Sequence, residues 1–177
     1  DISKREEIHR IVKNIEEKFQ LSKKKIITFS VRTNQYHLNE GNKTSDRNYS
    51  IERYLKIFKY LNENNYKIFR INSEKLTYCS EELNKYFIDP QNDKLKITQS
   101  YLIKKSEFFI SSPSGPVDIA LALQKPIILI NFASLHNLMF CNPYFTKNII
   151  FKKYKKISNG EFISYKTVIE KKLYNYF

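Results

Sequence analysis

A run of small residues, Ser111 to Gly115, is the part of the sequence best suited to binding chemistry. It follows a short apolar run at 108–110, and a helical pattern separates it from a second apolar run at 127–130. This order predicts a strand, a turn, a helix and another strand. The first turn of a helix presents unpaired backbone N–H groups and the positive end of the helix dipole. We therefore predict a phosphate or carboxylate site at this turn, formed by Ser111, Ser112, Ser114 and Gly115.

Arg32 is the second candidate for this chemistry. It follows a continuous β-rich run at 26–31 with too little polarity for a one-sided strand, as expected of a central strand in a parallel sheet, and it opens a long polar stretch. In an open, doubly wound sheet, ligands bind beyond the carboxyl ends of the two strands at which the strand order reverses. We expect those two strands to be 26–31 and 108–110. Because a guanidinium suits phosphate oxygens, Arg32 and the small-residue turn together predict a diphosphate site.

Four further residues fall on the predicted rim of this site. His37 lies in the long polar stretch, Arg47 and Asn48 close it before the next helix, and Arg70 ends the second predicted strand. Each arginine has a structural alternative. Arg47 could be a solvated loop charge, and Arg70 could pair with Asp89 or with a loop carboxylate. The serines likewise could form only a turn and a helix cap.

The elements that must position these residues alternate between helical and strand patterns, which predicts a parallel sheet with right-handed crossovers. We expect one α/β domain spanning 1–177, a doubly wound, mostly parallel Rossmann-like sheet of about five strands. The predicted helices cover 1–22, 50–64, 95–105, the segment after Gly115, and 160–177 with Ser164 as N-cap. A further short helix is capped by Thr77 or Ser80. The predicted strands cover 26–31, 66–71, 108–110 and 127–130, with a weak strand at 87–89 and an extended segment at 148–154.

Composition narrows the class of protein. The net charge of +13 favours anionic ligands, but the lysines are spread along the chain except at 23–25 and 152–156. With three glycines and no glycine-rich phosphate motif, the sequence argues against a P-loop NTPase and a dinucleotide-dependent dehydrogenase. No pattern of metal ligands is present, so we predict neither a metal nor a cofactor. No apolar run is long enough to span a membrane, and we expect a cytoplasmic location, with the inner-membrane surface as an alternative.

Several segments resemble, in their order, a group of bacterial glycosyltransferases of GT-B type. In that group, a strand ends in a His-Val-Arg-like triplet, and an Arg-Asn pair opens the next helix. A strand that contains Ile-Arg follows, and then a Ser-Gly turn that leads into a helix and a Pro-Val-rich strand. The matching segments are VRT at 31–33, SDRNYSIERYLKIFKYLNENNYKIFRI at 45–71, IDP at 88–90 and FFISSPSGPVDIALALQKPIILIN at 108–131. Two positions depart from the pattern: Ser30 stands where the triplet carries His, and Asn72 stands where Gly is common.

The resemblance implies the carboxyl-terminal half of such an enzyme, which holds a nucleotide-sugar donor as substrate for the synthesis of bacterial surface glycans. It places Arg32, Ser112, Ser114 and Gly115 near the diphosphate, and Arg47, Asn48 and Arg70 at other recurring positions. The catalytic residues are not identified, and an acceptor-binding domain or partner chain would be needed besides.

Two other interpretations remain open at this point. One is a basic Rossmann-like module that binds nucleic acid or an acidic partner, although the chain carries no recognised nucleic-acid-binding signature, so we do not expect nucleic acid. The other is a transferase domain that has lost activity. Contact with an anionic membrane through the basic surface is a further expectation.

Overall fold

The computed structural model describes residues 2–31, 50–72, 76, 79–90, 95–132 and 146–172. Its centre is a five-stranded sheet in the order β2-β1-β3-β4-β5, and every neighbouring pair is parallel. The strands are β1 (Lys25–Ser30), β2 (Tyr66–Arg70), β3 (Phe108–Ser111), β4 (Ile127–Phe132) and β5 (Thr146–Phe151). The apolar content of β1, from Ile26 to Phe29, agrees with its central position, since helices cover both of its faces.

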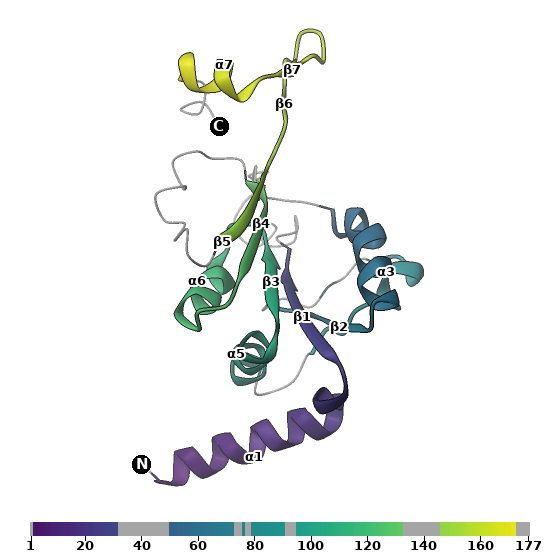
Figure 1. Ribbon diagram of the computed structural model, residues 1–177, viewed down its shortest axis with the longest axis vertical. Coiled ribbons are helices and arrows are strands. Elements are labelled where there is room, and N and C mark those ends of the chain that lie inside the picture. Colours follow the sequence, from purple (N-terminus) through teal and green to yellow (C-terminus); the bar gives the residue numbers. More distant parts are fainter. Residues whose placement is uncertain are drawn as a thin grey trace.

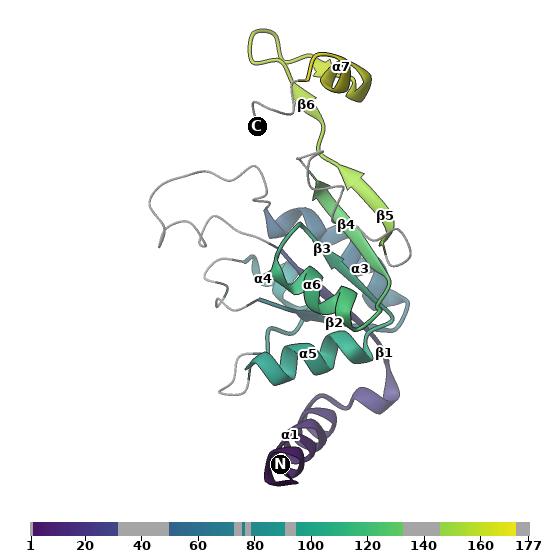
Figure 2. The ribbon, with the colours of Figure 1, turned by 90° about the vertical axis from the view of Figure 1, so that its left-hand side faces the viewer.

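Helices lie on both sides of this sheet. Figure 1 shows α5 and α6 on one side and α3 on the other, and the turned view of Figure 2 agrees. The helices are α1 (Ile2–Phe19), α3 (Leu55–Glu63), α4 (Glu81–Asn84), α5 (Leu95–Lys105), α6 (Gly115–Ala122) and α7 (Tyr165–Glu170), with short 3-10 helices η1 (Leu21–Lys23) and η2 (Ile51–Tyr54). None of the helices in these described ranges is long and apolar enough to cross a membrane.

Two apolar cores result, one on each face of the sheet. On the α3 side, Phe29 of β1 packs against Phe58 of α3 with ring centroids 4.6 Å apart, and against Phe87 at 5.3 Å. On the α6 side, Phe109 of β3 and Leu102 of α5 are fully buried in a core that also holds the end of α1. Successive strand residues alternate between these two cores, which sets the direction of each side chain at the strand ends.

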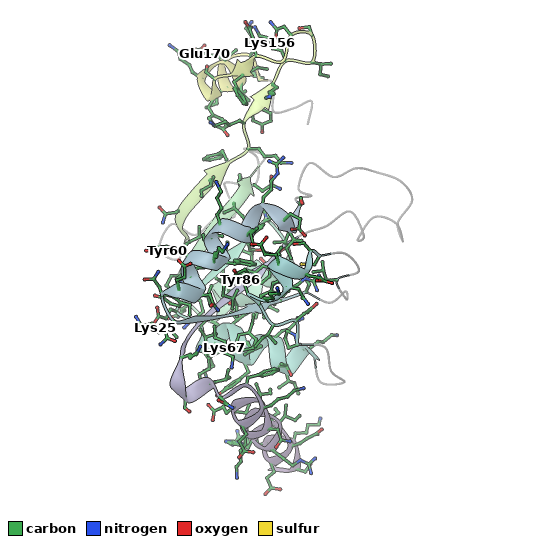
Figure 3. The ribbon with its side chains drawn as sticks, turned by 90° about the vertical axis from the view of Figure 1, so that its right-hand side faces the viewer. Lys25, Tyr60, Lys67, Tyr86, Lys156 and Glu170 are labelled. Atoms are coloured by element: carbon green, nitrogen blue, oxygen red, sulfur yellow. The ribbon has the colours of Figure 1, made fainter. Side chains whose placement is uncertain are left out.

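The chain beyond β5 projects away from the sheet (Figure 1). We call residues 152–172 the C-terminal arm; it contains the hairpin β6 (Tyr154–Lys155) and β7 (Phe162–Ile163), followed by α7. The rings of Phe151, Tyr154 and Tyr165 pack together at its base, with centroids 5.2 and 6.0 Å from that of Tyr165. Figure 3 labels Lys156 and Glu170 on this arm, beyond the end of the sheet, and Tyr60 and Tyr86 on the α3 side of the sheet.

The predicted α/β class and the parallel sheet are confirmed, and two predicted elements differ in detail. The segment 87–89 forms a single bridge, Ile88 to Phe69, at the edge of β2, because Pro90 ends it after one pair. The fifth strand is instead β5, in the segment predicted to be extended. The predicted N-cap of the last helix is confirmed: Ser164 accepts a hydrogen bond from the Thr167 N–H, and α7 begins at Tyr165. Residues 162–163, at the start of the predicted range 160–177, form β7 instead.

Candidate functional site

The carboxyl ends of β1 and β3 lie side by side, as the sequence predicted. β1 pairs with β2 on one side and β3 on the other, so the strand order reverses between β1 and β3. Ser30 and Ser111, the last residues of the two strands, are register partners, and the Ser112 N–H donates to the Ser30 carbonyl at 3.3 Å. The small-residue turn therefore starts beside the point at which the chain leaves β1.

Three serine hydroxyls gather at this point, on the α6 side of the sheet. The Ser111 Oγ lies 3.1 Å from the Ser114 Oγ and also donates to the Ser112 carbonyl at 2.6 Å. Ser30 and Ser111 are both fully buried. Within the described residues the Ser30 Oγ has no hydrogen-bond partner, although buried hydroxyls are almost always paired. A polar ligand at the carboxyl end of β1 could supply the hydrogen-bond partner that the Ser30 hydroxyl lacks among the described residues.

The N-terminus of α6 follows directly. Ser114, its N-cap, has an extended backbone, but its side chain does not cap the helix, because the hydroxyl faces Ser111 instead. Pro116 in the first turn has no N–H, so the helix start presents few donors that need a protein partner. Among the residues that the structure describes, no atom lies within 4 Å of a Cβ placed on Gly115. The backbone at Gly115 therefore borders open space at the positive end of the helix dipole.

Arg70 ends β2 on the other side of β1. Arg70 is only 1% exposed, and its Nη1 donates a hydrogen bond to the Asp89 Oδ2 at 2.7 Å. The bridge between β2 and Ile88 holds this carboxylate in place, since the Arg70 N–H donates to the Ile88 carbonyl at 2.8 Å. The structure thus contains the ion pair that was the structural alternative for Arg70.

Asn72 is a residue whose position the sequence did not reveal. Its side-chain amide spans the ends of β2 and β1: the Oδ1 accepts from the Val31 N–H at 3.4 Å, and the Nδ2 donates to the Val31 carbonyl at 3.3 Å. The Gln99 amide, from α5, donates to the Asn72 carbonyl at 2.6 Å. Asn72 thereby fixes the backbone one residue before Arg32.

Asn131 is a second such residue. It lies near the carboxyl end of β4, is 6% exposed, and has a left-handed φ of 55°. The register of β4 with β5 shifts between Leu129 and Phe132, around this residue. Asn tolerates a left-handed backbone better than most residues, so an Asn inside an apolar run was the available signal for an irregular strand end.

Four predicted site residues, Arg32, His37, Arg47 and Asn48, lie outside the described residues. The others divide into two groups: Ser111, Ser112, Ser114 and Gly115 form one turn, whereas Arg70 pairs with Asp89 beyond β1. In the part of the chain that the structure describes, no three His, Cys, Asp or Glu residues cluster as a metal site would require.

Solved structures with the same fold are found by structural comparison, whereas protein-family models and curated proteins give no match. The glycosyl transferase family 9 protein of Veillonella parvula superposes with a TM-score of 0.58 at 14% identity, over 97% of this chain and 52% of that one. The E. coli ADP-heptose LPS heptosyltransferase II gives 0.54 at 16%, over 92% and 50%. This chain has the fold of one half of a GT-B-type glycosyltransferase.

A third solved structure agrees with this fold. TibC of enterotoxigenic E. coli, a dodecameric iron-containing heptosyltransferase solved with ADP-D-beta-D-heptose, gives a TM-score of 0.52 at 16% identity, over 76% of this chain and 33% of that one. At such low identities the similarity establishes the fold alone. The chain spans about half the length of the first two structures.

Proposed function

We propose that this chain is the donor-binding half of a glycosyltransferase and that it binds a nucleoside-diphosphate sugar at the ends of β1 and β3. The observation that carries the proposal is the serine cluster of Ser30, Ser111 and Ser114 beneath the uncapped start of α6, with open space before Gly115. The fold supports it, because solved structures of this fold include an ADP-heptose LPS heptosyltransferase and a heptosyltransferase in complex with ADP-D-beta-D-heptose. A role in bacterial surface glycan synthesis is part of the same proposal.

In this proposal the diphosphate lies over the Gly115 backbone. The Gly115 N–H and the dipole of α6 stabilise its charge, and Arg32 supplies a guanidinium from the residue after Val31. When the bond from the sugar to the diphosphate breaks, negative charge grows on the departing oxygen, so donors already in position lower the barrier. The chain supplies this stabilisation with its own residues, without a metal. The acceptor and the group that takes its proton belong to the other half of the enzyme.

Calorimetric titration with ADP, UDP, GDP and CMP tests the proposal. We expect one nucleoside diphosphate to bind best, and Gly115→Ala to weaken it by about tenfold or more, because the added methyl occupies the space that the phosphate needs. The substitution should leave thermal stability nearly unchanged, since no atom of the described part of the chain lies within 4 Å of the new methyl. Arg32→Ala should weaken binding to a similar extent.

Arg10→Ala is the matched control, because it removes the same group from the exposed face of α1. Binding that is tight but equal in Gly115→Ala, Arg32→Ala and Arg10→Ala would reject this site. A chain that binds no nucleotide, yet binds unrelated oligonucleotides with a steep salt dependence, would favour the basic binding module instead.

A further inference from the structure

The face of the sheet on the α3 side is only partly covered. η2, α3 and α4 pack into the core over β2, β1 and β3. Farther along the same face, beyond Ile57 of α3, lies a groove of about 810 Å³. Its floor is the surface of β3, β4 and β5, one wall is η2 with the start of α3, and the other wall is the C-terminal arm. This groove is on the opposite face from the serine cluster.

The floor of the groove is aliphatic. Strand alternation directs Ile110, Ile128 and Ile130 to this face, and Ile150 of β5 continues the row. Ile150 is 57% exposed and Ile57, at the wall, is 43% exposed. An apolar row of this kind in contact with water is unfavourable, and it favours an apolar ligand.

The rim is cationic. Lys153 and Lys155 on the arm, with Arg53 on the helical wall, line the groove, and no Asp or Glu is among its described lining residues. The Lys153 and Lys155 Nζ atoms lie 5.4 and 4.8 Å from the centroid of the same Phe162 ring. Two like charges gathered at one ring repel each other, and an anion between them would relieve that repulsion.

The two carboxylates of the arm, Glu161 and Glu170, each form an ion pair with a lysine outside the groove. Glu161 accepts from the Lys156 Nζ at 2.8 Å, and this hydrogen bond lowers the pKa of the Glu161 carboxyl. No carboxylate of the described residues forms an ion pair with Lys153 or Lys155. Uncharged hydrogen-bonding side chains in the groove are limited to Tyr54 and Asn131 in its described lining, so it offers little to a sugar or a nucleobase.

We propose that this groove binds an anionic amphiphile, with the apolar chain along the isoleucine floor and a phosphate or carboxylate head between Lys153 and Lys155. Aliphatic floor and cationic rim match the two halves of such a molecule. The proposal is independent of the nucleotide site, because the two sites lie on opposite faces of the sheet and share no residue.

Titration with dodecyl phosphate below its micelle concentration tests this site. We expect it to bind at least tenfold more tightly than inorganic phosphate, which lacks the chain, and dodecyl maltoside, which lacks the charge. The paired substitution Lys153→Ala and Lys155→Ala should lower the affinity for dodecyl phosphate about tenfold or more. Ile150→Thr keeps a β-branched residue and should weaken binding by shortening the apolar floor.

Two matched controls separate this groove from general basicity. Lys96→Ala with Lys104→Ala removes two exposed lysines that line a smaller groove between α1 and α5, and Ile8→Thr changes an exposed isoleucine of α1. Both should bind dodecyl phosphate as the parent chain does, and so should Gly115→Ala. Equal loss in the control and test pairs, or equal affinity for dodecyl phosphate and dodecyl maltoside, would overturn the proposal.

Vesicles of phosphatidylcholine, with and without phosphatidylglycerol, distinguish the source of the ligand. Binding to monomeric dodecyl phosphate together with the anionic vesicles supports a membrane lipid as its source, and binding to the monomer alone supports a free amphiphile. Binding to the vesicles without any binding to the monomer would reject the groove.

Discussion

Arg70 is the one charged residue among the buried polar side chains of the described part of the chain. Removing a guanidinium from water is costly, and the Asp89 carboxylate at 2.7 Å compensates for that cost. The exposed pair of Lys59 and Glu82, at 3.3 Å, has the same chemistry but remains in water. The two pairs therefore contribute very differently to stability.

Asp89→Ala should lower the free energy of unfolding by about 3 kcal/mol, because it leaves a buried charge without its partner. Glu82→Ala should lower it by less than about 1 kcal/mol. Urea unfolding followed by circular dichroism measures both. If the two variants lose similar free energies of unfolding, the charge of Arg70 is not buried as the structure indicates.

Asn72 would act on the proposed nucleotide site through the backbone of Val31, the residue directly after β1. Asn72→Asp replaces the Nδ2 donor with an oxygen that repels the Val31 carbonyl, so the segment that leads to Arg32 loses its fixed start. We expect nucleotide affinity to fall about tenfold while the sheet persists. Titration and thermal unfolding of the same samples separate the two effects.

Asn64→Asp is the control for that substitution, since Asn64 also donates to a backbone carbonyl, that of Tyr60, but at the end of α3. It should not change nucleotide affinity. If both variants bind equally well, Asn72 has a purely structural role.

These residues show what the sequence could and could not reveal. The turn of serines and Gly115 between β3 and α6 was predictable, because small residues between a strand pattern and a helical pattern indicate such a turn. Its use as an anion site stays a prediction. The pairing of Arg70 with Asp89 was foreseen only as one of two alternatives, because its partner depends on how an edge segment meets β2. The contacts of Asn72 were not predictable, because they exist only once β1 and β2 are neighbours.

At the scale of elements, α1 is held to α5 by polar contacts as well as by apolar packing. The Glu16 carboxylate accepts a hydrogen bond from the Tyr101 hydroxyl and lies 3.0 Å from the Lys105 Nζ. These two partners lower the pKa of Glu16 below its ordinary value, with the tyrosine contributing most. Burial raises the pKa of Tyr101, and the hydrogen bond to Glu16 adds to that rise.

The lowered pKa of Glu16 gives a prediction with a definite sign. A carboxyl whose pKa is lower in the folded state stabilises the fold above its ordinary pKa, and this contribution is lost as the pH falls through the folded value. Wild type should therefore resist urea better than Glu16→Gln at pH 7, and the difference should shrink as the pH falls below 4.5.

Glu17→Gln is the control, since Glu17 lies on the same helix and its one ion pair within the described residues is with exposed Lys13 at 3.9 Å. Its difference from wild type should be smaller at pH 7. If the difference in urea resistance between wild type and Glu16→Gln stays constant with pH, the lowered pKa of Glu16 does not contribute to stability.

Long elements were predicted better than short ones. The strands at 26–31, 66–71 and 127–130 and the helix at 95–105 match β1, β2, β4 and α5 within one or two residues, because uninterrupted apolar runs and helical spacing mark them. The hairpin of β6 and β7 was not predicted. Strands of two residues show no periodicity, and their pairing depends on a turn that places Gly160 at a φ of 71°.

At the scale of the whole molecule, the net charge of +13 predicts that ligands which bind through the basic surface depend more strongly on salt than a ligand bound at one specific site. A nucleoside diphosphate contacts few cations, so its affinity should fall less than about tenfold between 0.05 and 0.5 M NaCl. A single-stranded oligonucleotide covers many lysines, and its affinity should fall by about a hundredfold or more. Parallel titrations in the two salts measure this difference. Equal salt slopes would indicate that the nucleotide binds only through the basic surface.

The position of β1 in the sheet has a consequence for how the chain is made. β1 leaves the ribosome before its neighbours β2 and β3, whose sequences follow only after long connections. Until they arrive, its apolar residues 26–29 are an unpaired β-forming segment, the kind that associates between chains. Lys23, Lys24 and Lys25 stand immediately before it, where like charges oppose such association. Besides contributing to the basic surface, these lysines should therefore reduce association between nascent chains while the neighbours of β1 are still missing.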